Sequence, residues 1–274
     1  MKSVFIALIF GFFTLTSASA IIGSVEKVEG SVKVKSQGSI KKSKIKIGQK
    51  IQAGDLITTS RKGKTVIKLV DGSSIVLDIS TSVHFASNNA IDQKSGKVFY
   101  NITSRNAKNS LKVKTPFAII GIKGTTFVVN SSEEKKSVAL KEGKIGVASA
   151  TPQSFSLYRK EVLAKYNAYV KDQMAGFSKF KGEEPPKPEI TKEFDLKAGN
   201  VISFEGNTVK ESAWSSEDDS EFGSYEGMVG GLASRAKVKM SKTIKNVDDE
   251  FGDAGRSKEK GGDLLDDVDK SMDF

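Results

Sequence analysis

The segment TPFAIIGIKGTTFVV, residues 115–129, places two glycines, a lysine and two threonines between apolar runs, and phosphate-binding loops use the same residue types. A P-loop has the spacing G-x-x-x-x-G, followed directly by lysine and a hydroxyl residue, and it opens a helix. Here Lys123 precedes Gly124, and Gly121 is too close to Gly124 for that pattern. The following TTFVV favours a strand, so no helix N-terminus faces a phosphate. We therefore predict a β-corner in which the glycines allow the backbone to turn, with no nucleotide or other cofactor bound.

Other residues that could do chemistry are few. His84 is the only histidine, and its surroundings, STSVHFAS, are typical of a strand surface rather than of a general base. Asp55, Asp71 and Asp78 adjoin turns, where aspartate has an ordinary structural role. No Gly-x-Ser-x-Gly elbow is present, and the acidic run at 263–269 lacks the glycine and final glutamate of a calcium loop. The sequence predicts a protein that is not an enzyme, with a hydrolase of cell-wall material as the remaining catalytic alternative.

The elements that carry these residues are short strands. From residue 24 to 147, runs such as VEGSVKVK alternate valine with lysine, which puts one face on a core and the other in water. TVIKLVDGSSIVLDI is a hairpin signal, because Asp71-Gly72 is a favoured turn pair between runs of β-branched residues. Pro116 cannot donate to a ladder and is expected at a strand start, edge or bend. The predicted fold is mainly β, a compact wound or sandwich-like domain.

The pattern changes after Pro152. Apolar residues recur three or four apart from Ser154 to Phe180, which predicts an inserted amphipathic helix, and EEPPKPE predicts a stiff connector. EFDLKAGNVISFEG then returns to strand character. Beyond Lys210 the chain is acidic and glycine-rich, which favours a largely disordered tail, with a helix over 228–244 that docks on a membrane or partner as an alternative. The predicted parts are a signal peptide (1–20), a β-domain (21–150), a helical insertion with its connector (151–190), a closing strand (191–210) and the tail (211–274).

The N-terminus and the charge distribution bear on compartment and partners. Lys2, an apolar run and Ala18-Ser19-Ala20 are typical of a cleaved export signal, with an uncleaved anchor as the alternative. The chain has no cysteine, so neither a disulfide framework nor a thiolate metal site is available. Residues 21–210 hold 33 bases and 17 acids, a net +16, whereas residues 211–274 hold 9 bases and 16 acids, a net −7. This asymmetry suggests attraction to polyanions, a tail that shields the body, or only solubility.

An ordered set of short motifs resembles the FecR-domain family over about residues 24–150, with 195–204 as a plausible closing piece. The motifs run from VEGSV at 28–32 through IQAGDLITT at 51–59 and LVDGS at 69–73 to KEGKI at 141–145. The signature residues are Thr115, Pro116, Gly121, Gly124, Thr125 and Phe127, with Gly54, Asp55, Asp71 and Gly72 in the earlier motifs.

The resemblance implies a periplasmic all-β domain that, in the best-known members, relays a signal from an outer-membrane receptor to a membrane-bound regulator of a sigma factor. This sequence shows neither a membrane span after a cytoplasmic head nor a sigma-binding head. We therefore expect a periplasmic or secreted, noncatalytic module that binds an envelope protein or relays a signal. An anionic glycan or lipid surface is the alternative partner, and nucleic acid is not expected.

Overall fold

The computed structural model describes residues 20–103, 110–175 and 187–230. Apart from Gly230, these residues belong to the first of two units into which the chain divides, residues 1–229. The predicted signal peptide lies outside the described residues except for Ala20, and so does the predicted tail beyond residue 230. Among the described residues, no helix has the length and apolar character needed to cross a membrane.

The described part of the chain is mainly β, as predicted. Its strands are β1 (Ile21–Glu29), β2 (Val32–Lys35), β3 (Ser43–Lys44), β4 (Lys50–Gln52), β5 (Asp55–Thr59), β6 (Lys64–Leu69), β7 (Ser74–Leu77), β8 (Ser82–Ser87), β9 (Ala90–Ile102), β10 (Leu111–Lys114), β11 (Ala118–Ile122), β12 (Thr125–Ser131), β13 (Lys136–Glu142), β14 (Lys144–Ser149), β15 (Phe155–Tyr158), β16 (Glu189–Thr191), β17 (Glu193–Lys197), β18 (Asn200–Glu205) and β19 (Thr208–Ala213).

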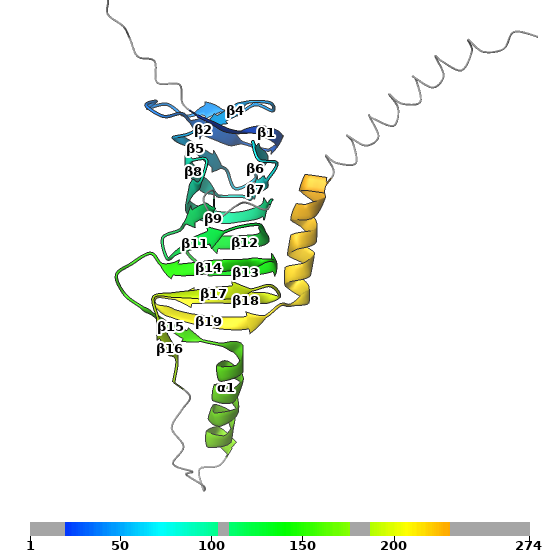
Figure 1. Cartoon of the computed structure of the whole chain (residues 1–274). Helices are drawn as coiled ribbons and strands as arrows, with labels where there is room; N and C mark the ends of the chain where they lie inside the picture. The colour runs from blue at the N-terminus through cyan, green and yellow to red at the C-terminus, as the bar shows by residue number, and fades with distance from the viewer. Residues whose placement is uncertain (1–19, 104–109, 176–186, 231–274) are drawn as a thin grey trace, which may run out of the picture. The chain divides into compact units, whose positions relative to one another are not determined.

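These strands form two sheets that are continuous through one shared strand, β9 (Figure 1). The first sheet has the order β4-β1-β6-β7-β9-β12-β13-β18-β19-β15-β16. The second sheet has the order β3-β2-β5-β8-β9-β10-β11-β14-β17. The long strand β9 pairs with β8 and β10 through its first half and with β7 and β12 through its second half.

The core lies between the two sheets, where alternate residues of each strand meet. In β2 the two valines are buried while the lysines face outward, and β10 repeats the pattern with Leu111 and Val113 inside. The predicted Asp71-Gly72 hairpin is present between β6 and β7, and Gly72 has a φ of 87° that a residue with a side chain rarely adopts. Burial of the strands' apolar faces therefore holds the two sheets together.

The predicted inserted helix is present but shorter than expected. It is α1 (Lys160–Ala175), whereas the prediction began at Ser154. Phe155 and Leu157 instead belong to β15 and are buried in the core, where a two-residue period buries both side chains. The predicted single closing strand is also a simplification, because β17, β18 and β19 follow the connector as three strands.

Residues 216–230 form a second helix, which we call the covering helix, where composition favoured disorder. Its start is a capping box: the Ser215 hydroxyl accepts from the Asp218 backbone N–H at 3.3 Å, and Asp218 Oδ2 accepts from the Ser215 backbone N–H at 2.8 Å. Within the helix only Phe222 and Tyr225 are buried, at 0% and 3% exposure. The predicted tail is therefore ordered at least to residue 230.

The covering helix packs on the outer face of the first sheet, where five apolar residues lie side by side on five strands. This apolar row is Val66, Val76, Phe99, Val128 and Ala139, each paired in register with the next. Phe99 contacts both buried residues of the helix, edge-on to Phe222 at 5.7 Å and stacked on Tyr225 at 5.5 Å between ring centres. The helix removes this second apolar face from water, which alternation in the strands alone did not predict.

Candidate functional site

The outer face of the second sheet carries a row of residues with a gap at its centre. Lys112, Gly121, Gly146 and Asp195 pair in register across β10, β11, β14 and β17. The residues on either side of Gly121, Ile120 and Ile122, point into the core. The two glycines therefore present bare backbone on the outer face, between a lysine and a carboxylate.

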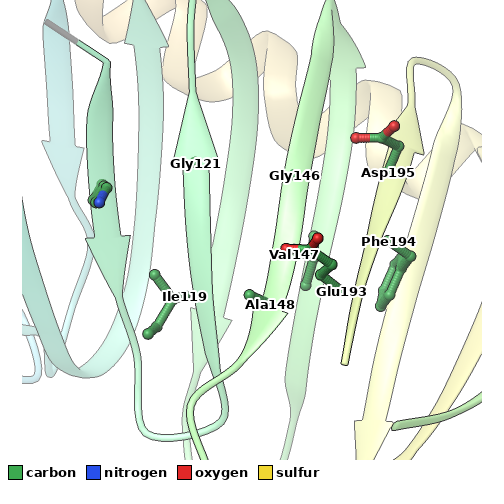
Figure 2. A pocket seen from close by; sticks show the side chains of 9 residues that line it. Ile119, Gly121, Gly146, Val147, Ala148, Glu193, Phe194 and Asp195 are labelled. Carbon is green, nitrogen blue, oxygen red and sulfur yellow. The ribbon is translucent and has the colours of Figure 1, made fainter. Parts of the chain in front are cut away.

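The missing side chains create a groove of about 590 Å³. Figure 2 shows the two glycines on adjacent strands, with Ile119 and Ala148 further along the same strands and Asp195 on the strand beside Gly146. A Cβ atom on Gly146 would meet nothing within 4 Å, and one on Gly121 would only touch the Gly146 carbonyl oxygen at 4.0 Å. Neither glycine has a positive φ. The backbone does not require glycine at either position, and the absence of two side chains leaves the groove open.

The charges around this glycine groove are of opposite sign at its two sides. Lys112 is exposed on one side, and Glu193 and Asp195 are exposed on the other. Asp195 forms an ion pair with Lys144 at 2.7 Å. Arg159 donates to the Asp195 carbonyl oxygen at 3.3 Å and lies 5.5 Å from the centre of the Phe194 ring. The groove is thus a polar surface, with a positive charge on one side, negative charges on the other and main chain between them.

This arrangement is suited to recognition rather than to catalysis. The backbone groups of the floor are already paired between β11 and β14, so a partner cannot add to the sheet there. A large side chain can enter the space above the glycines and contact Ile119 and Ala148. Charged groups on either side of that side chain would meet Lys112 and Glu193. The groove therefore fits a loop or extended segment of a protein.

The signature residues of the segment 115–129 do not meet at one point. Thr115 is buried and closes the turn between β10 and β11: its hydroxyl donates to the Ala118 carbonyl oxygen at 2.9 Å and accepts from the Ala118 N–H at 2.9 Å. Pro116 lies in the same turn. Gly124 and Thr125 lie at the other end of β11, and Gly124 turns the chain with a φ of 134°. Phe127 is buried in the core.

Gly121 alone of these residues lines the groove. The prediction that it bends the backbone is wrong, because it occupies the middle of a regular strand. The four earlier signature residues lie elsewhere. Gly54 and Asp55 join β4 to β5, and Asp55 accepts the Gln52 N–H at 2.9 Å. Asp71 and Gly72 form the turn between β6 and β7, where Asp71 accepts the Ser73 N–H at 3.0 Å.

Residues 55–146 match the family model described as FecR protein. The chain contains a FecR domain. The match runs from the start of β5 into β14 and includes both glycines of the groove. It is narrower than the resemblance over 24–150 that the motifs suggest. No curated protein matches the chain.

Three solved structures are similar to parts of the chain that contains this FecR domain. Two are crystal structures of candidate anti-sigma factors from Parabacteroides distasonis ATCC 8503. One is 16% identical, covers 59% of this chain and 61% of its own, and has a TM-score of 0.38. The other is 15% identical over 58% of this chain and 99% of its own, with a TM-score of 0.30. A structure described as a cell surface anchoring domain is 30% identical over 24% of this chain and 86% of its own, with a TM-score of 0.23.

His84 lies on the outer face of the second sheet within the FecR domain. Its Nδ1 is 3.3 Å from Asp92 Oδ2, and Lys94 contacts the same carboxylate oxygen at 3.3 Å. The side chain is about one-third exposed, as expected for a strand-surface residue. Within the described ranges, no group of three or more His, Asp or Glu side chains is arranged to hold a metal ion.

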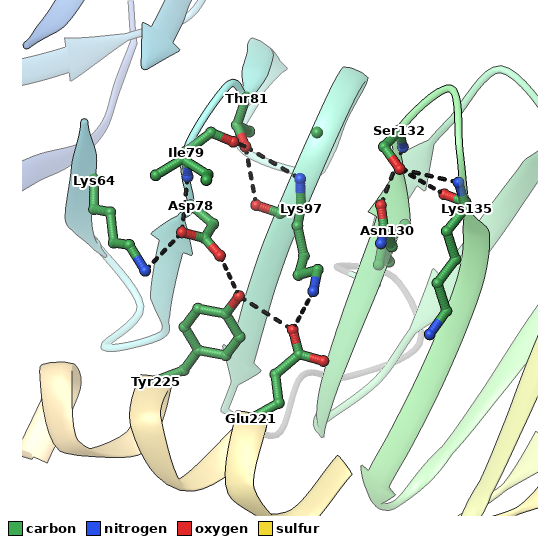
Figure 3. A network of polar contacts seen from close by, with 12 residues as sticks. Lys64, Asp78, Ile79, Thr81, Lys97, Asn130, Ser132, Lys135, Glu221 and Tyr225 are labelled. Atoms are coloured by element: carbon green, nitrogen blue, oxygen red, sulfur yellow. Dashed lines mark hydrogen bonds and ion pairs between the residues drawn. The ribbon is translucent and has the colours of Figure 1, made fainter. Parts of the chain in front are cut away.

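A second polar cluster joins the FecR domain to the covering helix (Figure 3). The Tyr225 hydroxyl donates to Asp78 Oδ2 at 2.6 Å, and Lys64 pairs with Asp78 Oδ1 at 2.8 Å. Glu221 forms an ion pair with Lys97, and Glu226 forms one with Lys141 at 2.6 Å. The acidic residues of the helix thus neutralise lysines of the sheet, which fits the idea of a tail that shields the basic body.

These contacts predict a pH dependence of stability centred on Asp78. Burial alone would raise the pKa of Asp78, but hydrogen bonds from Lys64, Tyr225 and the Ile79 N–H outweigh burial and lower it. A carboxylate with a lowered pKa in the folded state stabilises the fold above its unfolded pKa, near 3.8, and this contribution is lost as pH falls through the folded value. We expect Asp78→Asn to lower the free energy of unfolding by about 1–2 kcal/mol at pH 7.

Urea denaturation of wild type and Asp78→Asn at pH 7 and near pH 3 measures this effect. The gap in unfolding free energy between the two proteins should shrink at the lower pH, because below pH 3.8 the unfolded wild-type carboxyl binds its proton more tightly than the folded one does, which removes part of the contribution of the charge. A gap of the same size at both pH values would show that the charge of Asp78 contributes nothing. Glu133→Gln, an exposed acid on the β12–β13 turn, is the matched control and should show no gap at either pH.

Sequence reasoning missed four residues of the groove: Gly146, Lys112, Glu193 and Asp195. Lys112, Glu193 and Asp195 are unremarkable in their own strands, and only the register across four strands brings them beside Gly146. The signal that was available is the glycine in KIGVAS, which interrupts a strand pattern at a position with no turn. Such a glycine marks a close approach or an open space, and here it marks an open space.

Proposed function

We propose that this protein is an exported, noncatalytic FecR-type module that binds a partner protein of the bacterial envelope and so relays a signal. The observation that carries the proposal is the glycine groove, both of whose glycines lie within the segment that matches the FecR family. Gly121 is one of the residues in which the sequence resembles the FecR family, and the backbone does not require glycine there. An open surface for a partner would explain why this position is a glycine.

The lining of the groove favours a protein segment over a small molecule. Sites for small ligands enclose them with mostly apolar walls and a few polar groups. This groove has a floor of main chain and exposed charged residues at its sides, which resembles the polar surface of a non-obligate protein interface. The FecR match gives no support to the alternative of an anionic glycan or lipid partner, which depends on the surface chemistry of the chain alone.

Export is part of this proposal. The predicted cleavage site is followed directly by Ile21, and Ile21 is the first residue of β1. The predicted mature chain would therefore keep every strand, and of the described contacts it would lose the hydrogen bond from the Ala53 N–H to the Ala20 carbonyl oxygen at 2.9 Å. Intact-mass measurement of the protein from its native cells should give the mass of a chain that starts at Ile21, and a mass that retains residues 1–20 would remove this part of the proposal.

The binding test uses a photo-crosslinking amino acid, benzoylphenylalanine, at Ile119 in cells that express the protein natively. We expect one discrete adduct with an envelope protein. Gly146→Val should reduce this adduct at least about tenfold, because a branched side chain fills the groove while its Cβ meets no other atom. Circular dichroism melting should show that Gly146→Val still folds.

The matched control is Ser212→Val, which adds similar bulk to an exposed position of β19. This control should leave the adduct unchanged. An adduct of equal yield in Gly146→Val and Ser212→Val would contradict the groove as the binding surface. Absence of any discrete adduct from Ile119 would also count against the proposed partner.

A further inference from the structure

A second surface lies at the end of the sheets formed by the first strands of the fold. Among the described strands, β3 pairs with β2 alone and β4 pairs with β1 alone, so these are the end strands of the two sheets. β2 and β4 lie at one end of the stack of strands in Figure 1. Residues 36–50 run from the end of β2 through β3 to β4 and so pass from one sheet to the other. Ile45 from this segment is buried at 3% exposure and closes the end of the core.

The rest of this segment is strongly basic. Five lysines are exposed there, and the sequence has no acid between residues 30 and 54. The lysines are Lys41, Lys42, Lys44, Lys46 and Lys50. Lys44 also lies directly opposite Lys33 across β2 and β3, and like charges in that position destabilise a sheet. The acids nearest to these lysines lie on neighbouring strands. Glu26 is on β1, which lies beside this segment, and Asp55 is on β5 and is buried.

Two isoleucines stand among these lysines with their side chains in water. Ile40 is 93% exposed and Ile47 is 67% exposed. Ile47 is held at the tip of a defined turn, because the Gln49 N–H donates to the Lys46 carbonyl oxygen at 3.1 Å. The Gly48 N–H donates to the Val25 carbonyl oxygen at 2.8 Å, which fixes the turn to β1. Ile47 is therefore presented outward by the backbone.

Protection of sheet edges explains only half of this composition. Lysines on end strands prevent edge-to-edge pairing with another chain, and that need accounts for the basic residues. It does not account for large, exposed isoleucines beside them, which make the edge more prone to association. Basic residues around protruding apolar side chains are instead the composition of surfaces that lie on anionic membranes.

We infer that residues 40–50 form a docking surface for an anionic phospholipid bilayer, with the lysines on the headgroups and Ile40 and Ile47 inserted at the interface. We call this surface the basic end patch. The attraction also relieves the repulsion between Lys33 and Lys44. The patch lies on strands far from the groove in sheet order, so a membrane and a protein partner can be bound together. The inference does not depend on the proposed groove function.

The test is co-sedimentation with vesicles, using protein that begins at Ala20 so that the apolar run of the predicted signal peptide is absent. Vesicles of phosphatidylglycerol and phosphatidylcholine should bind at least about tenfold more protein than phosphatidylcholine alone, and binding should weaken as salt rises. Lys41→Gln with Lys42→Gln and Lys46→Gln should reduce binding about tenfold. Ile40→Ser with Ile47→Ser should reduce it about fivefold without any change of charge.

Matched controls separate binding by the patch from the effects of net charge and of exposed apolar residues elsewhere on the protein. Lys123→Gln with Lys135→Gln and Lys136→Gln removes the same charge from exposed turns elsewhere, and Val70→Ser with Ile190→Ser removes two other exposed apolar residues. Both controls should bind vesicles as wild type does, and so should Gly146→Val. Equal losses in the patch and control variants would overturn the inference. Binding to lipopolysaccharide with none to phosphatidylglycerol would also overturn it.

Discussion

Replacing Phe127 with alanine is expected to lower the free energy of unfolding by about 3–5 kcal/mol. The Phe127 side chain is fully buried between the sheets and stacks on Tyr100, with ring centres 4.8 Å apart and planes 9° from parallel. The Tyr100 hydroxyl donates to Gln93 Oε1 at 3.1 Å, which fixes the partner ring. Removal of Phe127 would leave a cavity that Tyr100 cannot fill without breaking this hydrogen bond.

Urea denaturation of Phe127→Ala and Phe127→Leu measures the effect. Leucine keeps much of the buried volume, so its loss should be clearly smaller than that of alanine. Lys123→Ala, at an exposed position on the turn between β11 and β12, serves as the control and should change stability by less than about 0.5 kcal/mol. A loss below about 1 kcal/mol for Phe127→Ala would show that the core relaxes around the gap.

Phe222→Ala is expected to release the covering helix and to cost about 2–4 kcal/mol. Phe222 is fully buried, packs edge-on to Phe99 and lies 4.7 Å from Trp214 between ring centres. The helix has little stability of its own, because Gly223, Gly227 and Gly230 each weaken it by about 1 kcal/mol relative to alanine. Its attachment therefore depends on the few side chains that reach the sheet.

Hydrogen exchange of amides 216–230 and the fluorescence of Trp214, the single tryptophan, report this release. The double variant Phe222→Ala with Tyr225→Ala should lose little more than the first substitution alone, because a detached helix has no further contact to lose. Ser224→Ala, on the exposed side, is the control and should leave exchange as slow as in wild type. Full additivity of the two aromatic substitutions would indicate a helix that stays attached.

The strand pattern was predictable because residues 24–147 repeat one simple rule, alternation with glycine at the turns. The turns at Asp71-Gly72 and at Glu142-Gly143 lie where the sequence places them. The prediction was wrong at Phe155 and Leu157, whose spacing of two is the period of a strand although they directly precede the helical pattern. Packing of Phe155 against Phe194 and Phe204 selects the strand, and these two residues lie about forty and fifty positions further along the chain.

The covering helix was missed because composition outweighed two local signals. Ser215 and Asp218 are spaced as a capping box, and Phe222 and Tyr225 are spaced three apart within an acidic run. The consecutive apolar residues of TTFVV were a third signal, since a strand buried on both faces needs something to cover its outer face. The glycine groove could not be predicted in the same way, because it depends on the register of four strands.

The shared strand β9 has a mechanical consequence. Its first half is hydrogen-bonded to β8 and β10 of the sheet that holds the groove, and its second half is hydrogen-bonded to β7 and β12 and packs against the covering helix. A twist imposed on one face therefore reaches the other along a single continuous backbone, without any hinge between rigid bodies. These thirteen residues therefore join the sheet that holds the groove to the sheet that the helix covers through one continuous backbone.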